Sequence, residues 1–154
     1  MYSPTQQAAD KSNQAAKLFM KHAIEHELAN NAIDAISRMY YACFHSMKAY
    51  IHLKSKGIVT IDSVKKMDIL TYVTHSDLRL MYFTLYKRNT ANMPYIFNSK
   101  PNKTLDVWHN CREEFDYHIK ETSFIDLSIL DRIHYDKMKE FVEAHISFID
   151  FELV

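Results

Sequence analysis

The sequence predicts an all-α protein, an antiparallel bundle of five to six helices. Glycine occurs only once in 154 residues and proline three times, whereas glycine alone usually makes up about 7% of a protein. Tight β-hairpins favour glycine or Asn-Gly turns, and the chain contains no Asn-Gly pair. Apolar residues recur at helical spacing along several long stretches, which is typical of helices that bury one face.

The first half of the chain predicts two long helices. One spans about Thr5 to Leu28, because its apolar residues follow the i, i+3, i+4 rhythm of a buried face. The stretch "ANNAID" (29–34) then supplies a break and a capping residue for the second helix, which continues to Lys56. Gly57 follows as the expected left-handed residue just beyond the helix end.

The second half is predicted to contain shorter helices and one loop. "TIDSVKKMDILTYV" (60–73) is predicted to be a helix capped by Thr60 or Asp62, and "SDLRLMYFTLYKR" (76–88) another. "NTANMPYIFNSKPNK" (89–103) has two prolines and four asparagines and is predicted to be a loop. Helices are also expected at about 104–121 and 127–152. We expect one domain over residues 1–154, with an extended middle segment at about 58–106.

Composition narrows the possible functions. The 19 basic and 19 acidic residues cancel, so no global field attracts nucleic acid or membrane, and any such site has to be local. Two cysteines in apolar helical patterns and no apolar run of about 18 residues lead us to expect a reduced cytoplasmic protein without a membrane span. His22 and His26 have metal-ligand spacing but no further ligands that match. We therefore expect neither a metal nor a cofactor.

A polar stripe runs along the second expected helix. Arg38, Tyr41 and His45 fall within one narrow sector of the helix, together with Asp34, Lys48 and His52. One interpretation is the solvated side of an amphipathic helix. The other is a functional surface, since an Arg and a His two turns apart can bind a phosphate and move a proton.

The same stretch resembles a known family. "NNAIDAISRMYYACFHSMKAYIHLKSKG" (30–57) is similar to the second-helix signature of the HEPN domain (higher eukaryotes and prokaryotes nucleotide-binding). The matching residues are Ala32, Ala35, Arg38, Tyr40, Tyr41, Ala42, Phe44 and Ala49. A second family feature, an Arg followed by Asp-Tyr on a later helix, matches Arg112, Asp116 and Tyr117 in "CREEFDYH". The resemblance implies a HEPN-like helical bundle of the prokaryotic stand-alone type that commonly forms homodimers.

The resemblance also implies two kinds of activity. Some members are metal-independent endoribonucleases of toxin–antitoxin and phage-defence systems, and these carry an Arg, four to six residues, and then a His. Arg112 and His118 satisfy that spacing. An Arg can hold the scissile phosphate and a His can transfer protons near neutral pH, with the two copies of a dimer forming one composite site. Other members are non-catalytic modules that bind nucleotide or accompany a nucleotidyltransferase.

Three interpretations of this pattern stay open. Glu113 stands where active members carry a small polar residue, and Arg112 and Asp116 have the spacing of a structural ion pair that could contact Arg38 or Tyr41. His109 lies one turn before Arg112 and either widens a phosphate site or packs at the helix start. The chain is thus expected to be a nucleotide- or RNA-interacting module with an antitoxin or nucleotidyltransferase partner, a ribonuclease, or a structural interaction protein.

Overall fold

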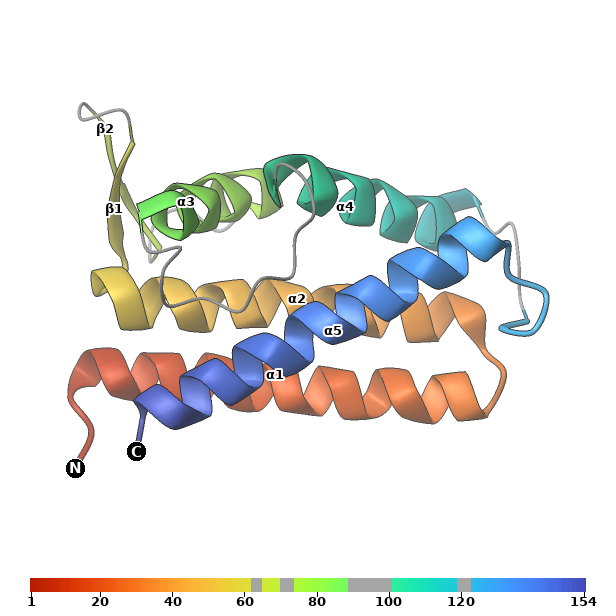
Figure 1. Ribbon diagram of the computed structural model, residues 1–154, viewed down its shortest axis with the longest axis horizontal. Coiled ribbons are helices and arrows are strands. Elements are labelled where there is room, and N and C mark those ends of the chain that lie inside the picture. The colour runs from red at the N-terminus through yellow and green to blue at the C-terminus, as the bar shows by residue number, and fades with distance from the viewer. Residues whose placement is uncertain (62–64, 70–73, 89–100, 119–122) are drawn as a thin grey trace.

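The protein is mostly helical, as the sequence predicts. The computed structural model describes residues 1–61, 65–69, 74–88, 101–118 and 123–154, without the side chains of 87–88, 101–106 and 117–118 (Figure 1). The described residues form five helices and one two-stranded sheet. In chain order these are α1 (Pro4–Leu28), α2 (Ala32–Ser55), β1 (Ile58–Ile61), β2 (Lys65–Asp68), α3 (His75–Arg88), α4 (Pro101–His118) and α5 (Ile129–Glu152).

Local capping fixes where α1 and α2 begin and end. The Ser3 side chain accepts a hydrogen bond from the Gln6 amide, and the Gln6 side chain accepts one from the Ser3 amide, so the two residues form a capping box. Asn31 caps α2 by accepting from the Asp34 amide, which confirms the predicted break. Lys56 and Gly57 both have positive φ, 55° and 85°, which confirms Gly57 as a left-handed residue after the helix.

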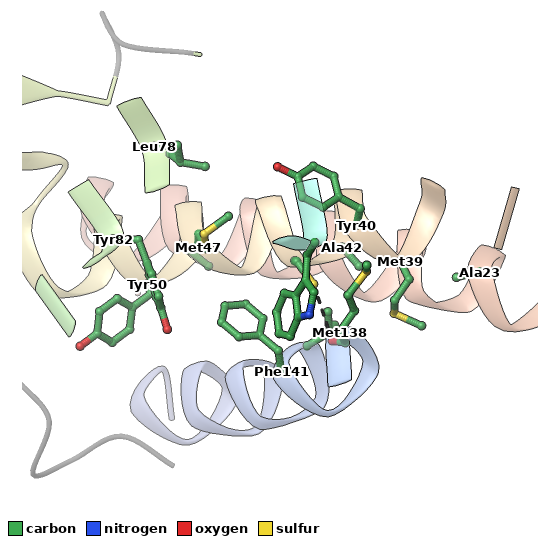
Figure 2. Close-up of a cluster of buried hydrophobic side chains, with 14 of the residues drawn as sticks. Ala23, Met39, Tyr40, Ala42, Met47, Tyr50, Leu78, Tyr82, Met138 and Phe141 are labelled. Carbon is green, nitrogen blue, oxygen red and sulfur yellow. Dashed lines mark hydrogen bonds between the residues drawn. The ribbon is translucent and has the colours of Figure 1, made fainter. Parts of the chain in front are cut away.

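Helix α2 is the centre of the bundle, since it contacts each of the other four helices. Figure 2 shows side chains of α2 packing against α3 and α5, with Met47 and Tyr50 facing Tyr82 and Phe141. The Tyr50 and Tyr82 rings lie 5.3 Å apart edge to face, a favourable aromatic geometry. Met47 and Tyr50 of α2 therefore belong to the core that α2 shares with α3 and α5.

The helices α1 and α5 run antiparallel. Asn13, near the start of α1, donates to the Asp150 carboxylate at the end of α5, at 2.8 Å. The Tyr135 hydroxyl near the start of α5 donates to Glu27 near the end of α1, also at 2.8 Å. Figure 1 accordingly shows both chain termini at the same end of the bundle, with α5 crossing in front of α1 and α2.

The helix predicted at residues 60–73 is wrong. Residues Ile58–Ile61 and Lys65–Asp68 instead form an antiparallel hairpin in which Val59 pairs with Met67. Val59 and Ile61 are buried and Ile58 is exposed, an alternation that suits a half-buried strand. The scarcity of glycine, which favours a helical protein over an antiparallel β fold, thus still allows one short hairpin. The turn residues, 62–64, lie outside the described residues.

The other helices differ from the prediction mainly at their ends. Thr74 caps α3 by accepting from the Asp77 amide, so the helix starts one residue earlier than predicted. Helix α4 begins at Pro101, where a proline without an amide hydrogen fits the first turn. Ser128 caps α5, which therefore starts two residues later than expected. The last three residues of the predicted loop, 101–103, belong to α4 instead, and the rest of it, 89–100, lies outside the described residues.

Candidate functional site

Arg112 of α4 is the most constrained charged side chain in the candidate site. Only 6% of the residue is exposed, and its Nη1 donates to Asp116 Oδ2 at 2.9 Å. The guanidinium lies over two rings of α2, with its carbon 5.3 Å from the Tyr40 centroid and 5.6 Å from the Tyr41 centroid. Its Nε is buried and has no hydrogen-bond partner among the described residues. One edge of the guanidinium therefore remains available to an acceptor.

His75, the first residue of α3, joins this group from a third helix. Its Nδ1 lies 3.0 Å from the Tyr40 hydroxyl, and the two rings stack with centroids 5.5 Å apart. The His109 ring of α4 lies 5.6 Å from the His75 ring. We call His75, Arg79, His109 and Arg112, with the rings of Tyr40 and Tyr41, the arginine–histidine cluster.

The arginines of the cluster affect the ionisation of neighbouring side chains as positive charges do. Burial, followed by Arg112, His109 and Arg79, lowers the pKa of His75 to about 4. Burial and then Arg79 lower the pKa of His109 as well. Burial raises the pKa of Tyr40 to about 12, although Arg79 acts in the opposite direction. Burial disfavours charge of either sign, whereas the two arginines favour an anion beside them.

Two carboxylates limit this positive character. Asp116 pairs with Arg112, and Glu113 Oε1 lies 3.2 Å from His109 Nε2. Neither carboxylate is deeply buried, since 22% of the Asp116 side chain and 44% of the Glu113 side chain are exposed. An incoming phosphate would have to compete with Asp116 for Arg112, but it could also use the free Nε. Arginine binds phosphate best through two parallel N–H groups.

The structure brings together some of the predicted site residues. Arg112 pairs with Asp116 and contacts Tyr41, one of the two α2 residues suggested for this pair, and His109 lies one turn from Arg112 with its ring 5.7 Å from that of Tyr40. Tyr117 and His118 belong to the last turn of α4, and their side chains lie outside those described. The predicted Arg112–His118 pair therefore remains a prediction.

The stripe residues of α2 lie at different places. Arg38 is exposed and makes no hydrogen bond or ion pair with any described residue. His45 stacks on Phe19 of α1 with ring centroids 5.2 Å apart, and burial, followed by the charge of Lys48, lowers its pKa to about 4. Of this stripe, Tyr41 contacts Arg112 of α4, whereas His45 contacts Phe19 of α1.

Sequence reasoning missed three members of the cluster. Tyr40 matches the family signature but was not expected in the site, and neither were His75 and Arg79. These residues come from two helices that are separated in sequence by the hairpin, so no local spacing relates them. The only sequence feature that could have indicated His75 is its position directly after the capping residue Thr74, which places the histidine at a helix start.

Comparisons with protein-family models, curated proteins and solved structures returned no match. Among the described residues, no three His, Cys, Asp or Glu side chains group as metal ligands. None of the helices, searched over the same residues, has the length and apolar character that crossing a membrane requires. Cys43 and Cys111 are buried and are not joined in a disulfide.

Proposed function

We propose that this chain is a HEPN-like module that binds the phosphate groups of nucleotides or RNA at the arginine–histidine cluster. The observation that carries the proposal is the Nε of the buried Arg112, which has no hydrogen-bond partner among the described residues and belongs to a guanidinium that lies over two tyrosine rings. A guanidinium fixed in this way loses little conformational freedom when it binds a phosphate. The neutral His75 and His109 can add hydrogen bonds without adding charge.

The proposal also covers the location, the oligomeric state and the biological system of the protein. We place it in the cytoplasm as a homodimer, in a prokaryotic toxin–antitoxin, defence or nucleotidyltransferase-associated system. The sequence resemblance supports this setting, and the two cysteines, which are not joined in a disulfide, agree with a reducing compartment. Light scattering coupled to size exclusion would measure the mass in solution, and a monomer at all concentrations would exclude the dimer.

Isothermal titration calorimetry with ATP tests phosphate binding directly. The wild-type protein should give saturable heat, and Arg112→Ala should weaken binding roughly tenfold or more, because a hydrogen bond to a charged group contributes about 1.5–3 kcal/mol. Lys137→Ala removes an exposed lysine of α5 and serves as the matched control. A flat wild-type titration, or equal affinity in wild type and Arg112→Ala, would contradict the proposal.

A second variant of Arg112 distinguishes a loss of binding from a folding defect. Arg112 is buried, so its truncation to alanine could destabilise the bundle. Arg112→Lys keeps the positive charge but loses the planar fork, and we expect it to bind ATP more weakly than wild type while keeping a wild-type circular dichroism spectrum. An unchanged affinity in Arg112→Lys would show that the fork has no part in binding.

A metal-independent ribonuclease is the second candidate function. The observation that favours it is a neutral imidazole, His75, close to the Arg112 guanidinium. A pKa of about 4 makes His75 a weak general base at neutral pH, so the acid–base role falls to His118. Structured RNA in the presence of EDTA should be cleaved by wild type, and not by Arg112→Ala or His118→Ala. No cleavage at all, or cleavage that survives both substitutions, would exclude this function.

A further inference from the structure

A groove with two adjoining hollows lies between α1 and α2. The first hollow has a volume of about 330 Å³ and the second about 300 Å³, and Ala8 and His52 line both. Helix α1 contributes mainly small side chains to the first hollow, among them Ser12 and Ala15. Small residues in α1 opposite long ones in α2 leave the space between the helices unfilled. We call this space the lysine groove.

The groove walls carry more positive than negative charge. Lys11 and Lys48 line the first hollow and Lys56 the second, whereas Asp68 is the one carboxylate that lines either. Lys11 and Lys48 form no ion pair with any residue that the structure describes. Burial and then Lys48 lower the pKa of His52, although Asp68 acts against this shift. The lysines that line the two hollows favour an anion in the groove, whereas burial disfavours charge of either sign.

One aromatic ring of α2 connects the groove with the cluster. The Phe44 centroid lies 4.5 Å from the His75 ring of the cluster and 5.5 Å from the His45 ring of the groove. Lys48 Nζ lies 5.7 Å from the same centroid. Phe44 is only partly buried. Phe44 thus contacts a residue of each of the two sites.

Both sites also lie on one side of the bundle. On a helix with 100° per residue, Tyr41, His45 and Lys48 point away from Cys43 and Tyr50, the α2 residues that contact α5 through Met138 and His145. A ligand can therefore run along α2, from Arg112 past Phe44 to Lys48, without crossing α5. Cationic side chains that alternate with partly exposed rings are typical of sites for single-stranded nucleic acid.

We infer that the lysine groove and the arginine–histidine cluster bind one strand together, so that the ligand is a single-stranded oligonucleotide rather than a mononucleotide. This inference rests on the proposed function and adds to it the length of the ligand. Arg112 binds one phosphate, Lys11 and Lys48 bind phosphates farther along the strand, and the ring of Phe44 lies between them.

The salt dependence of binding tests this inference. For single strands, log affinity falls against log salt with a slope of about 0.7 per neutralised phosphate. The paired substitution Lys11→Ala with Lys48→Ala should therefore reduce the slope for an eight-nucleotide RNA by roughly 1.4. The affinity for AMP should not change, because AMP uses only the cluster. Lys137→Ala should leave the slope for the octamer unchanged.

The outcomes separate this inference from the proposed function. If the paired lysine variant keeps the wild-type slope, or the octamer binds no more tightly than AMP, the inference is wrong although Arg112 can still bind phosphate. If Arg112→Ala binds both ligands as wild type does, the proposed function fails and the inference fails with it. Inorganic polyphosphate of matched charge is a third ligand, and binding as tight as that of RNA would overturn the assignment to nucleic acid.

Discussion

His145 lies in the centre of the core, and we expect acid to destabilise the protein through this residue. The side chain is fully buried. Its Nδ1 lies 2.8 Å from the Phe141 carbonyl, which can only accept, and its Nε2 lies 2.6 Å from the Tyr82 hydroxyl. Nδ1 therefore carries the proton, and Nε2 accepts a hydrogen bond from Tyr82. A second proton has no place in this arrangement.

The size of the effect follows from the pKa of His145. Burial lowers this pKa from 6.5 to about 4, although the hydrogen bond to Phe141 acts against the shift. Below pH 6.5 the unfolded chain binds a proton that the folded protein does not bind until the pH approaches 4. Stability is therefore lost as pH falls through this window, by about 1.4 kcal/mol per pH unit and on the order of 3 kcal/mol in total.

Urea unfolding at several pH values measures this loss. Trp108 is the only tryptophan, is buried, and lies 5.6 Å from the Phe141 ring, so its fluorescence reports on this part of the core. The double variant Tyr82→Phe with His145→Leu removes both polar partners at once, a change that costs little at neutral pH. It should lose less stability than wild type between pH 6.5 and 4.

The single variant Tyr82→Phe is the control for this comparison of wild type with the double variant. Tyr82→Phe leaves Nε2 of His145 without a donor and should cost about 1–3 kcal/mol at pH 7. His45 and His75 also have pKa values lowered to about 4, but both are retained in every variant and cancel in the comparison. Equal pH dependence in wild type and the double variant would refute the assignment to His145.

Two further predictions concern stability. Gly57→Ala should lower the free energy of unfolding, measured in urea, by about 1 kcal/mol or more, because φ is +85° and a Cβ would lie 3.0 Å from Ile69 Cγ2. The control Lys56→Gly, at φ 55°, should not destabilise the protein. Equal losses in both variants would contradict the argument. Tyr135→Phe should lower the free energy of unfolding by about 1.5–3 kcal/mol, because it removes a hydrogen bond to the Glu27 carboxylate. A similar change for Tyr2→Phe, at the exposed start of the chain, would show that this bond contributes nothing specific.

Most of the fold was predictable because long helices repeat the spacing of their apolar residues over several turns. The apolar residues of α1, α2 and α5 recur at helical spacing over many turns. Asn31, which caps a helix, and Gly57, which has a positive φ, indicate the two ends of α2. The hairpin was missed because its strands have four residues each, too few for alternation to be told from a helical turn. Its buried residues Val59 and Met67 suit either structure.

The candidate site was predictable only where its contacts are local. Arg112 and Asp116 are four residues apart on one helix, so their pairing follows from spacing. The contact between Tyr40 and His75 joins residues 35 positions apart, and it depends on where α3 packs against α2. The lysine groove likewise depends on how α1 packs against α2, which the small residues of α1 permit but do not specify.

The affinity of folded Asp116→Asn for ATP tests the central claim most directly. If Arg112 binds phosphate, replacing the carboxylate that occupies its Nη1 removes a competitor, and the affinity should rise by roughly fivefold, or about 1 kcal/mol. Arg112→Lys, measured beside it, should change affinity in the opposite direction. An Asp116→Asn protein that keeps the wild-type circular dichroism spectrum but binds ATP no more tightly would contradict the claim and leave the Arg112–Asp116 pair a structural clasp.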